Sequence, residues 1–156
     1  MQFVSESTID KAAEIIGSAE NLTDIIRVFK ESQPVILAYL FSENFKLLTQ
    51  QEREYMMFLA LVVWKASEAN QPEIDQVTEN TLEDLEEKNW EKFHKVISRK
   101  FNEKIDIFFK NYPQEDLLAF VEDGLVQDED SEITNEGRDY IFIALKTIID
   151  SLNTNG

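Results

Sequence analysis

Apolar side chains recur at helical spacing along most of this chain, and this periodicity limits the fold more than any other feature. Leu22, Ile25, Ile26 and Phe29, for example, stand at positions i, i+3, i+4 and i+7, on one face of an α-helix. The sequence contains only 4 Gly and 3 Pro, too few for the many turns of an all-β fold. We therefore expect an all-α protein.

The pattern predicts a compact bundle of about six to seven helices. A length of 156 residues suits one domain with a real core, so we expect residues 1–156 to form a single helical domain. Residues 78–89 are predicted as either an acidic helix or a loop. The other helices are expected at about residues 7–19, 22–32, 34–41, 49–70, 90–112, 113–124 and 134–152.

A central helix is predicted after Thr49, which begins a capping box with Glu52. This helix holds the longest apolar run, Tyr55 to Trp64, and a helix that is apolar on nearly all sides belongs in a core. The run is much shorter than the roughly 20 residues of a membrane span. The first residues do not read as a secretory signal. We expect a cytoplasmic protein that does not enter a membrane.

One long amphipathic helix is predicted over residues 90–112, because seven large side chains follow each other at spacings of three and four residues. They are Trp90, Phe93, Ile97, Phe101, Ile105, Phe108 and Tyr112. We interpret this stripe as a packing surface. If it is wider than one core can cover, Trp90 or Tyr112 would face a second copy of the chain, so a homo-oligomer is a further hypothesis.

A short β-hairpin is predicted near residues 125–134, with acidic residues in its turn. Asp123-Gly124-Leu125-Val126, this turn, and Ile133-Thr134-Asn135-Glu136-Gly137-Arg138 together resemble the wing of winged-helix regulators. In that family a Gly-Leu-Val strand leads through the turn to Leu-Thr-x-x-Gly-Arg at the start of a helix. The resemblance implies a regulator that contacts DNA. The turn is acidic here, which instead favours a wing that faces protein.

Charge is distributed unevenly along the chain, whose net charge is −16. Residues 73–91 carry eight acids and one base, residues 92–112 carry six bases and two acids, and residues 113–139 carry ten acids and one base. A nucleic-acid backbone requires a cationic footprint, so we expect no nucleic-acid partner. Two interpretations remain: solvated faces that partly neutralise each other when packed, or an acidic surface that recruits a basic protein.

The leading functional hypothesis is a non-enzymatic, acidic helical module for protein interaction or regulation, with a basic protein as partner. The alternatives are a degenerate winged-helix regulator and an enzyme that uses carboxylates, alone or with a divalent metal. The candidate partner-binding residues are Glu83, Asp84, Glu86, Glu87, Asp128, Glu129 and Asp130.

Sites for catalysis or metal binding are poorly supported by the sequence. It has no Cys and a single His, which removes thiolate and multi-histidine metal sites. Glu91 and His94 form a Glu-x-x-His pair, but carboxylate-bridged di-iron bundles need this pair on two helices. The acidic clusters lack the spacing of a calcium-binding EF-hand loop. We therefore predict no catalytic residues, no metal site and no cofactor.

Overall fold

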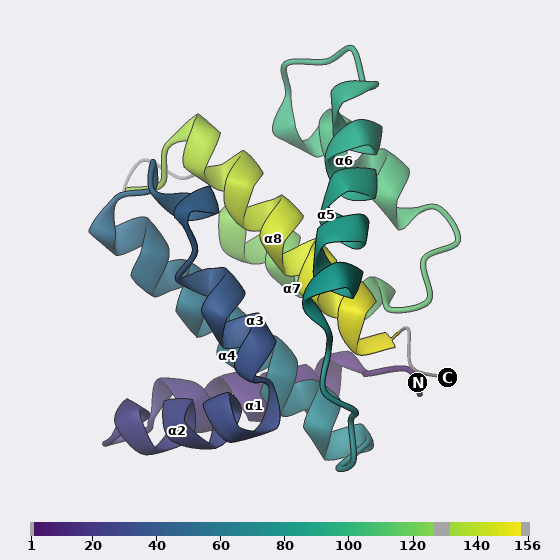
Figure 1. Ribbon diagram of the computed structural model, residues 1–156. Coiled ribbons are helices and arrows are strands. Elements are labelled where there is room, and N and C mark those ends of the chain that lie inside the picture. Colours follow the sequence, from purple (N-terminus) through teal and green to yellow (C-terminus); the bar gives the residue numbers. More distant parts are fainter. Residues whose placement is uncertain (1, 127–131, 154–156) are drawn as a thin grey trace.

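The computed structural model describes residues 2–126 and 132–153, and every regular element within these ranges is a helix. The prediction of an all-α protein is confirmed. Eight α-helices and one short 3-10 helix are described, slightly more than the six to seven expected (Figure 1). They are α1 (Glu6–Gly17), α2 (Leu22–Ser32), α3 (Pro34–Leu40), η1 (Glu43–Phe45), α4 (Gln50–Asn70), α5 (Glu79–His94), α6 (Phe101–Phe109), α7 (Glu115–Leu125) and α8 (Asn135–Asn153).

Helices α4 and α8 lie at the centre of the described structure and pack against each other. Helix α4 also contacts α1, α2 and α7, while α8 is covered by α5 and α7 (Figure 1). In α4 the segment from Leu59 to Trp64 is buried on all sides, as its apolar run predicts. In the part of the chain that the structure describes, no helix is both long and apolar enough to cross a membrane.

The start of α4 is connected to the start of α8 through Glu52. The predicted capping box is present: Glu52 accepts from the Thr49 backbone N–H at 2.9 Å, and its own N–H donates to the Thr49 hydroxyl. The other carboxylate oxygen of Glu52 accepts from both the backbone N–H and the hydroxyl of Thr134, each at 2.9 Å. The hydroxyl of Thr134 in turn accepts from the N–H of Gly137 in the first turn of α8. One buried carboxylate therefore organises two helix N-termini.

The predicted hairpin near residues 125–134 is wrong for the residues that the structure describes there. Leu125 is the last residue of α7, and Glu132, Ile133 and Thr134 form no strand. Two side chains bond the backbone on either side of residues 127–131, at the end of α7 and just before α8. The Tyr55 hydroxyl donates to the carbonyl of Gly124 at 2.5 Å, and Glu52 accepts from Thr134.

The single helix predicted over residues 90–112 is also wrong, because the chain leaves the helical path between α5 and α6. Ile97, in the middle of the predicted stripe, is fully exposed. The Ser98 hydroxyl accepts from the Lys100 N–H and donates to Glu103, and such local bonds compete with helix continuation. The break lets Phe101 and Phe108 pack edge-on against Phe142 of α8. Trp90 and Phe93 instead belong to α5, which also contains the acidic segment.

Candidate functional site

The four acidic candidates at residues 83–87 lie on α5, which packs along α8 (Figure 1). Glu83, Asp84 and Glu87 are exposed, and we call these three residues the acidic face of α5. Glu86 is half-buried and points to a different neighbour, the hydroxyl of Tyr39 on α3. Asp128, Glu129 and Asp130 lie outside the described residues.

The acidic face of α5 is not neutralised by the basic segment that follows it. Lys95 pairs with Glu91 at 3.4 Å, and Lys104 pairs with Asp139 of α8 at 3.5 Å. Lys92 lies over the ring of Phe108, with its ammonium 5.3 Å from the ring centre. Among the described residues, no Lys or Arg forms an ion pair with any member of the acidic face. Its carboxylates therefore remain available to an external cation.

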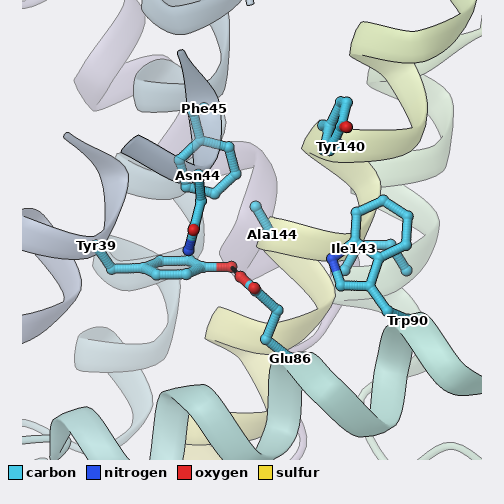
Figure 2. Close-up of a pocket in the computed structure, with 8 residues that line it drawn as sticks. All are labelled: Tyr39, Asn44, Phe45, Glu86, Trp90, Tyr140, Ile143 and Ala144. Atoms are coloured by element: carbon cyan, nitrogen blue, oxygen red, sulfur yellow. Dashed lines mark hydrogen bonds between the residues drawn. The ribbon is translucent and has the colours of Figure 1, made fainter. Parts of the chain in front are cut away.

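A small cavity of about 150 Å³ lies beside Glu86, where α3, η1, α5 and α8 meet (Figure 2). We call it the aromatic pocket, because four of its eight lining side chains are aromatic rings. The lining residues are Tyr39, Asn44, Phe45, Glu86, Trp90, Tyr140, Ile143 and Ala144.

The rings of the aromatic pocket form two perpendicular pairs. Tyr39 and Phe45 have centroids 5.2 Å apart and planes at 85°, while Trp90 and Tyr140 are 5.4 Å apart at 72°. In Figure 2 the first pair lies on the left and the second on the right, with Glu86 between them. Each pair is in the edge-to-face arrangement that aromatic rings prefer, which stabilises these ring positions.

Glu86 is the only acid among the residues that line the aromatic pocket, and it accepts a hydrogen bond from the Tyr39 hydroxyl. Burial, and then the nearby charge of Glu86, raise the pKa of Tyr39 well above 10.0. Tyr39 therefore keeps its proton at neutral pH and remains a donor. No Lys or Arg lines this pocket, so a bound cation would meet one carboxylate and no competing positive lining residue.

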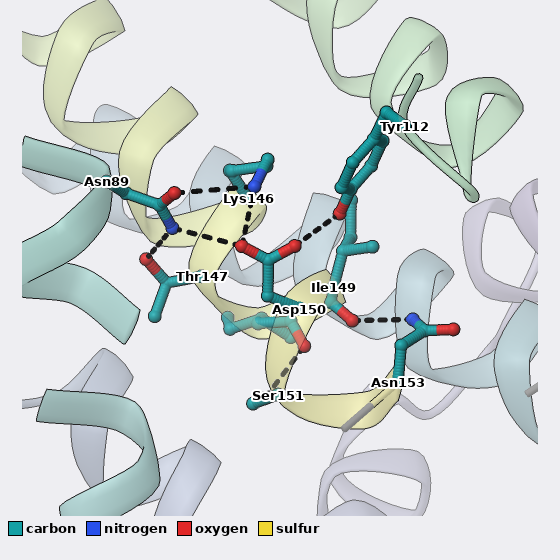
Figure 3. Close-up of polar contacts among 9 residues, drawn as sticks. Asn89, Tyr112, Lys146, Thr147, Ile149, Asp150, Ser151 and Asn153 are labelled. Atoms are coloured by element: carbon teal, nitrogen blue, oxygen red, sulfur yellow. Dashed lines mark hydrogen bonds and ion pairs between the residues drawn. The ribbon is translucent and has the colours of Figure 1, made fainter. Parts of the chain in front are cut away.

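A buried polar cluster holds α5 against α8 (Figure 3). Asp150 accepts from Lys146 at 2.6 Å, from Asn89 at 3.2 Å and from the hydroxyl of Tyr112 at 2.6 Å. Asn89 of α5 also donates to Thr147 of α8 and accepts from Lys146. Burial lowers the pKa of Lys146, while the charge and hydrogen bond of Asp150 act in the opposite direction. The polar side chains of this cluster bond one another, and Asn89 thereby fixes α5, which carries the acidic face, against α8.

The predicted pair Glu91 and His94 does not join the aromatic pocket. The His94 ring stacks on Trp90 with centroids 5.4 Å apart, and Glu91 pairs with Lys95. Across residues 2–126 and 132–153, no three acidic or His side chains are grouped so that they could hold a metal ion.

A larger groove of about 690 Å³ lies between α2, α3, η1 and α4, and its lining is mainly apolar. The charged residues around it are Glu43, Lys46, Arg53 and Glu54, two of each sign. The guanidinium of Arg53 already donates to the carbonyls of Phe45 and Lys46. The groove has the size of a ligand site, but its polar groups do not favour one class of ligand.

The aromatic pocket is the site that sequence reasoning missed. Its walls come from residues 39–45, 86–90 and 140–144, three segments far apart in the sequence. Periodicity places Trp90 and Tyr140 on apolar helix faces but does not show that they meet. The one available signal is that Glu86 stands four residues after Leu82 and four before Trp90, so it shares the apolar face of the helix with them.

Comparison of the chain with known protein families, curated proteins and solved structures gives no match. No function is therefore transferred from a relative, and the function is inferred from the chemistry and geometry of the site residues. The segment that resembles a winged-helix wing spans the end of α7, the residues that connect it to α8 and the start of α8, and residues 127–131 of its turn lie outside the described residues.

Proposed function

We propose that this protein is a non-enzymatic binding module that recognises a basic segment of a partner protein through the acidic face of α5. Two observations together carry the proposal: this face forms no ion pair with the other described residues, and its three exposed carboxylates lie close to one another on a single helix. Three carboxylates within five residues of one helix form a compact negative surface. A basic partner would supply the counter-charges that the described residues do not.

Helix α5, which carries these carboxylates, is held in place by the core, and this favours binding at a defined site over attraction by net charge alone. Asn89 bonds both Thr147 and Asp150 of α8, and Leu82 and Phe93 are buried in the core. Side chains on a fixed scaffold lose less conformational freedom on binding than side chains on a mobile loop. The backbone that carries the acidic face is therefore fixed before binding.

The net charge of −16 adds a long-range contribution to the same interaction. A field of one sign attracts oppositely charged partners and raises the rate of encounter, and salt screens this effect. Contacts between exposed ions contribute roughly 0.2–1 kcal/mol each. We therefore expect binding that is fast, of moderate affinity and strongly dependent on ionic strength.

The test uses a short fluorescent peptide of alternating Lys and Arg, with its affinity measured by anisotropy. The test variant carries Glu83→Gln, Asp84→Asn and Glu87→Gln. The control variant carries Asp10→Asn, Glu14→Gln and Glu20→Gln, which removes the same charge from other exposed acids. Loss of three ion pairs should weaken binding about three- to hundredfold in the test variant. The control variant should lose markedly less.

The outcomes separate recognition from general attraction. Equal losses in the two variants would mean that only net charge attracts the peptide, and the proposal would be wrong. It would also be wrong if the wild-type protein does not bind the peptide at low salt, or binds it equally well near 1 M salt, where the screening length is about 3 Å. A duplex DNA of the same label should not bind.

A further inference from the structure

We propose that the aromatic pocket receives the cationic head group of one side chain, an alkylammonium such as that of lysine or its methylated forms. This inference rests on the proposed function, because the acidic face of α5 would hold the partner segment that supplies the side chain. It names a separate site, with its own residues and its own ligand chemistry.

The first argument is the nature of the walls. Aromatic rings attract cations through the negative charge of their faces, and cages of several rings are the known way to recognise methylated ammonium groups. Here four rings surround one cavity: Tyr39 and Phe45 on one wall, Trp90 and Tyr140 on the other (Figure 2). Tyr39, Trp90 and Tyr140 are each only half-buried.

The second argument is the charge inside the pocket. Glu86 lies between the two walls, and its carboxylate is held in place by the Tyr39 hydroxyl (Figure 2). The remaining lining residues, Asn44, Ile143 and Ala144, are uncharged. A carboxylate next to aromatic rings attracts a cation and disfavours an anion, and it gives a neutral ligand no comparable advantage.

The third argument is size and position. A space of about 150 Å³ fits a head group and not a peptide backbone, so the rest of a ligand must lie outside. Glu86 is adjacent in sequence to Glu87 and three residues from Glu83, so one basic segment can reach both sites. A lysine side chain combines the long apolar stem and charged end that this geometry requires.

The test uses two small probes that avoid the partner altogether: the Nα-acetyl amide of trimethyllysine, and its neutral isostere with carbon in place of the quaternary nitrogen. Binding is followed by NMR through the indole N–H signals of the two tryptophans. The signal of Trp90 should shift with the cation at concentrations at least about tenfold lower than with the isostere. Trp64 is buried in the core, so its signal should not move.

Variants identify the groups responsible. Glu86→Gln should weaken cation binding about tenfold, whereas Glu79→Gln, which removes the same charge from an exposed position in the first turn of α5, should leave it unchanged. If Glu86→Gln disturbs the fold, Tyr140→Leu gives an independent reading. It removes one ring, keeps the carboxylate and should reduce the preference for the cation over the isostere.

The results distinguish this inference from the proposed function. Equal response of Trp90 to both probes, or no response, would overturn the inference even if the Lys-Arg peptide binds through the acidic face. Selective cation binding would support the inference, and it would do so even if neutralising Glu83, Asp84 and Glu87 has no effect on the peptide.

Discussion

The backbone of Gly137 lies directly against the carboxylate of Glu52. A Cβ atom added at Gly137 would fall 1.8 Å from Oε2 of Glu52, well inside any real contact distance. This close approach brings the first turn of α8 onto the start of α4 and allows Glu52 to accept two hydrogen bonds from Thr134. The contact between the two central helices therefore depends on the missing side chain at this position.

Gly137→Ala should destabilise the protein by about 1–3 kcal/mol, because the added methyl group must displace a side chain that three hydrogen bonds hold in place. Urea denaturation measures the change. The matched control is Gly17→Ala at the end of α1, where a Cβ would meet nothing within 4 Å. This change should be neutral or stabilising by up to about 1 kcal/mol. Equal effects of the two substitutions would contradict the close approach.

Glu52 should also make stability depend on pH. Burial raises the pKa of its carboxyl, but the hydrogen bonds from Thr49 and Thr134 outweigh burial and leave the pKa below 4.5. The ionised form thus stabilises the folded state above pH 4.5, and this contribution is lost as the pH falls through the lowered pKa. Glu52→Gln should cost about 1–3 kcal/mol at neutral pH.

Urea titrations of the wild type and Glu52→Gln at a series of pH values test this dependence. Burial raises the pKa of Asp139 and Glu122, so the difference between the two proteins is more informative than either curve alone. That difference should shrink as the solution is acidified below pH 4.5. A difference that stays constant with pH would show that the charge of Glu52 is not responsible.

Lys146 and Asp150 should be strongly coupled, because both side chains are largely buried and their charged atoms are 2.6 Å apart. Lys146→Met leaves a buried carboxylate without its cation and should cost about 3–5 kcal/mol. Asp150→Asn removes the charge but keeps an acceptor for Tyr112. In a double-mutant cycle the double variant should lose less unfolding free energy than the sum of the losses in the two single variants. Strict additivity would mean that the pair does not interact.

Ile97 should tolerate a charge, although sequence periodicity places it in the middle of an apolar stripe. Its side chain is fully exposed in the segment between α5 and α6. Ile97→Lys should therefore change stability by no more than about 0.5 kcal/mol. Ile105→Ala, a truncation at a completely buried position of the same stripe, should cost about 2–5 kcal/mol. A large loss from Ile97→Lys would instead favour one continuous helix.

Local signals predicted the helices of this protein well. The capping box of Thr49 and Glu52 identified the start of α4 within one residue, and the apolar run to Trp64 identified its place in the core. Both predictions depend on residues close together in the sequence. A capping box is a pair of hydrogen bonds between residues three apart, and a helix that is apolar on nearly all sides must be buried by other elements.

The failures have a common main cause, which is competition from contacts between residues far apart in the sequence. Residues 95–100 contain neither Gly nor Pro, and Ser98, whose side chain bonds the backbone locally, is too weak a signal to mark the break between α5 and α6 by itself. The break is favoured by packing of Phe101 and Phe108 on Phe142, which local reasoning does not see. Glu86 was grouped with its exposed neighbours for the same reason. Its partner Tyr39 is 47 residues away.

The most direct test of the proposed function is an NMR titration of the uniformly ¹⁵N-labelled protein with the Lys-Arg peptide. We predict that the largest amide shifts fall on α5, around Glu83, Asp84 and Glu87, and that they disappear in the variant that neutralises these three residues. Shifts spread evenly over acidic residues of other helices, such as Asp10 and Glu14 of α1, would contradict recognition by α5.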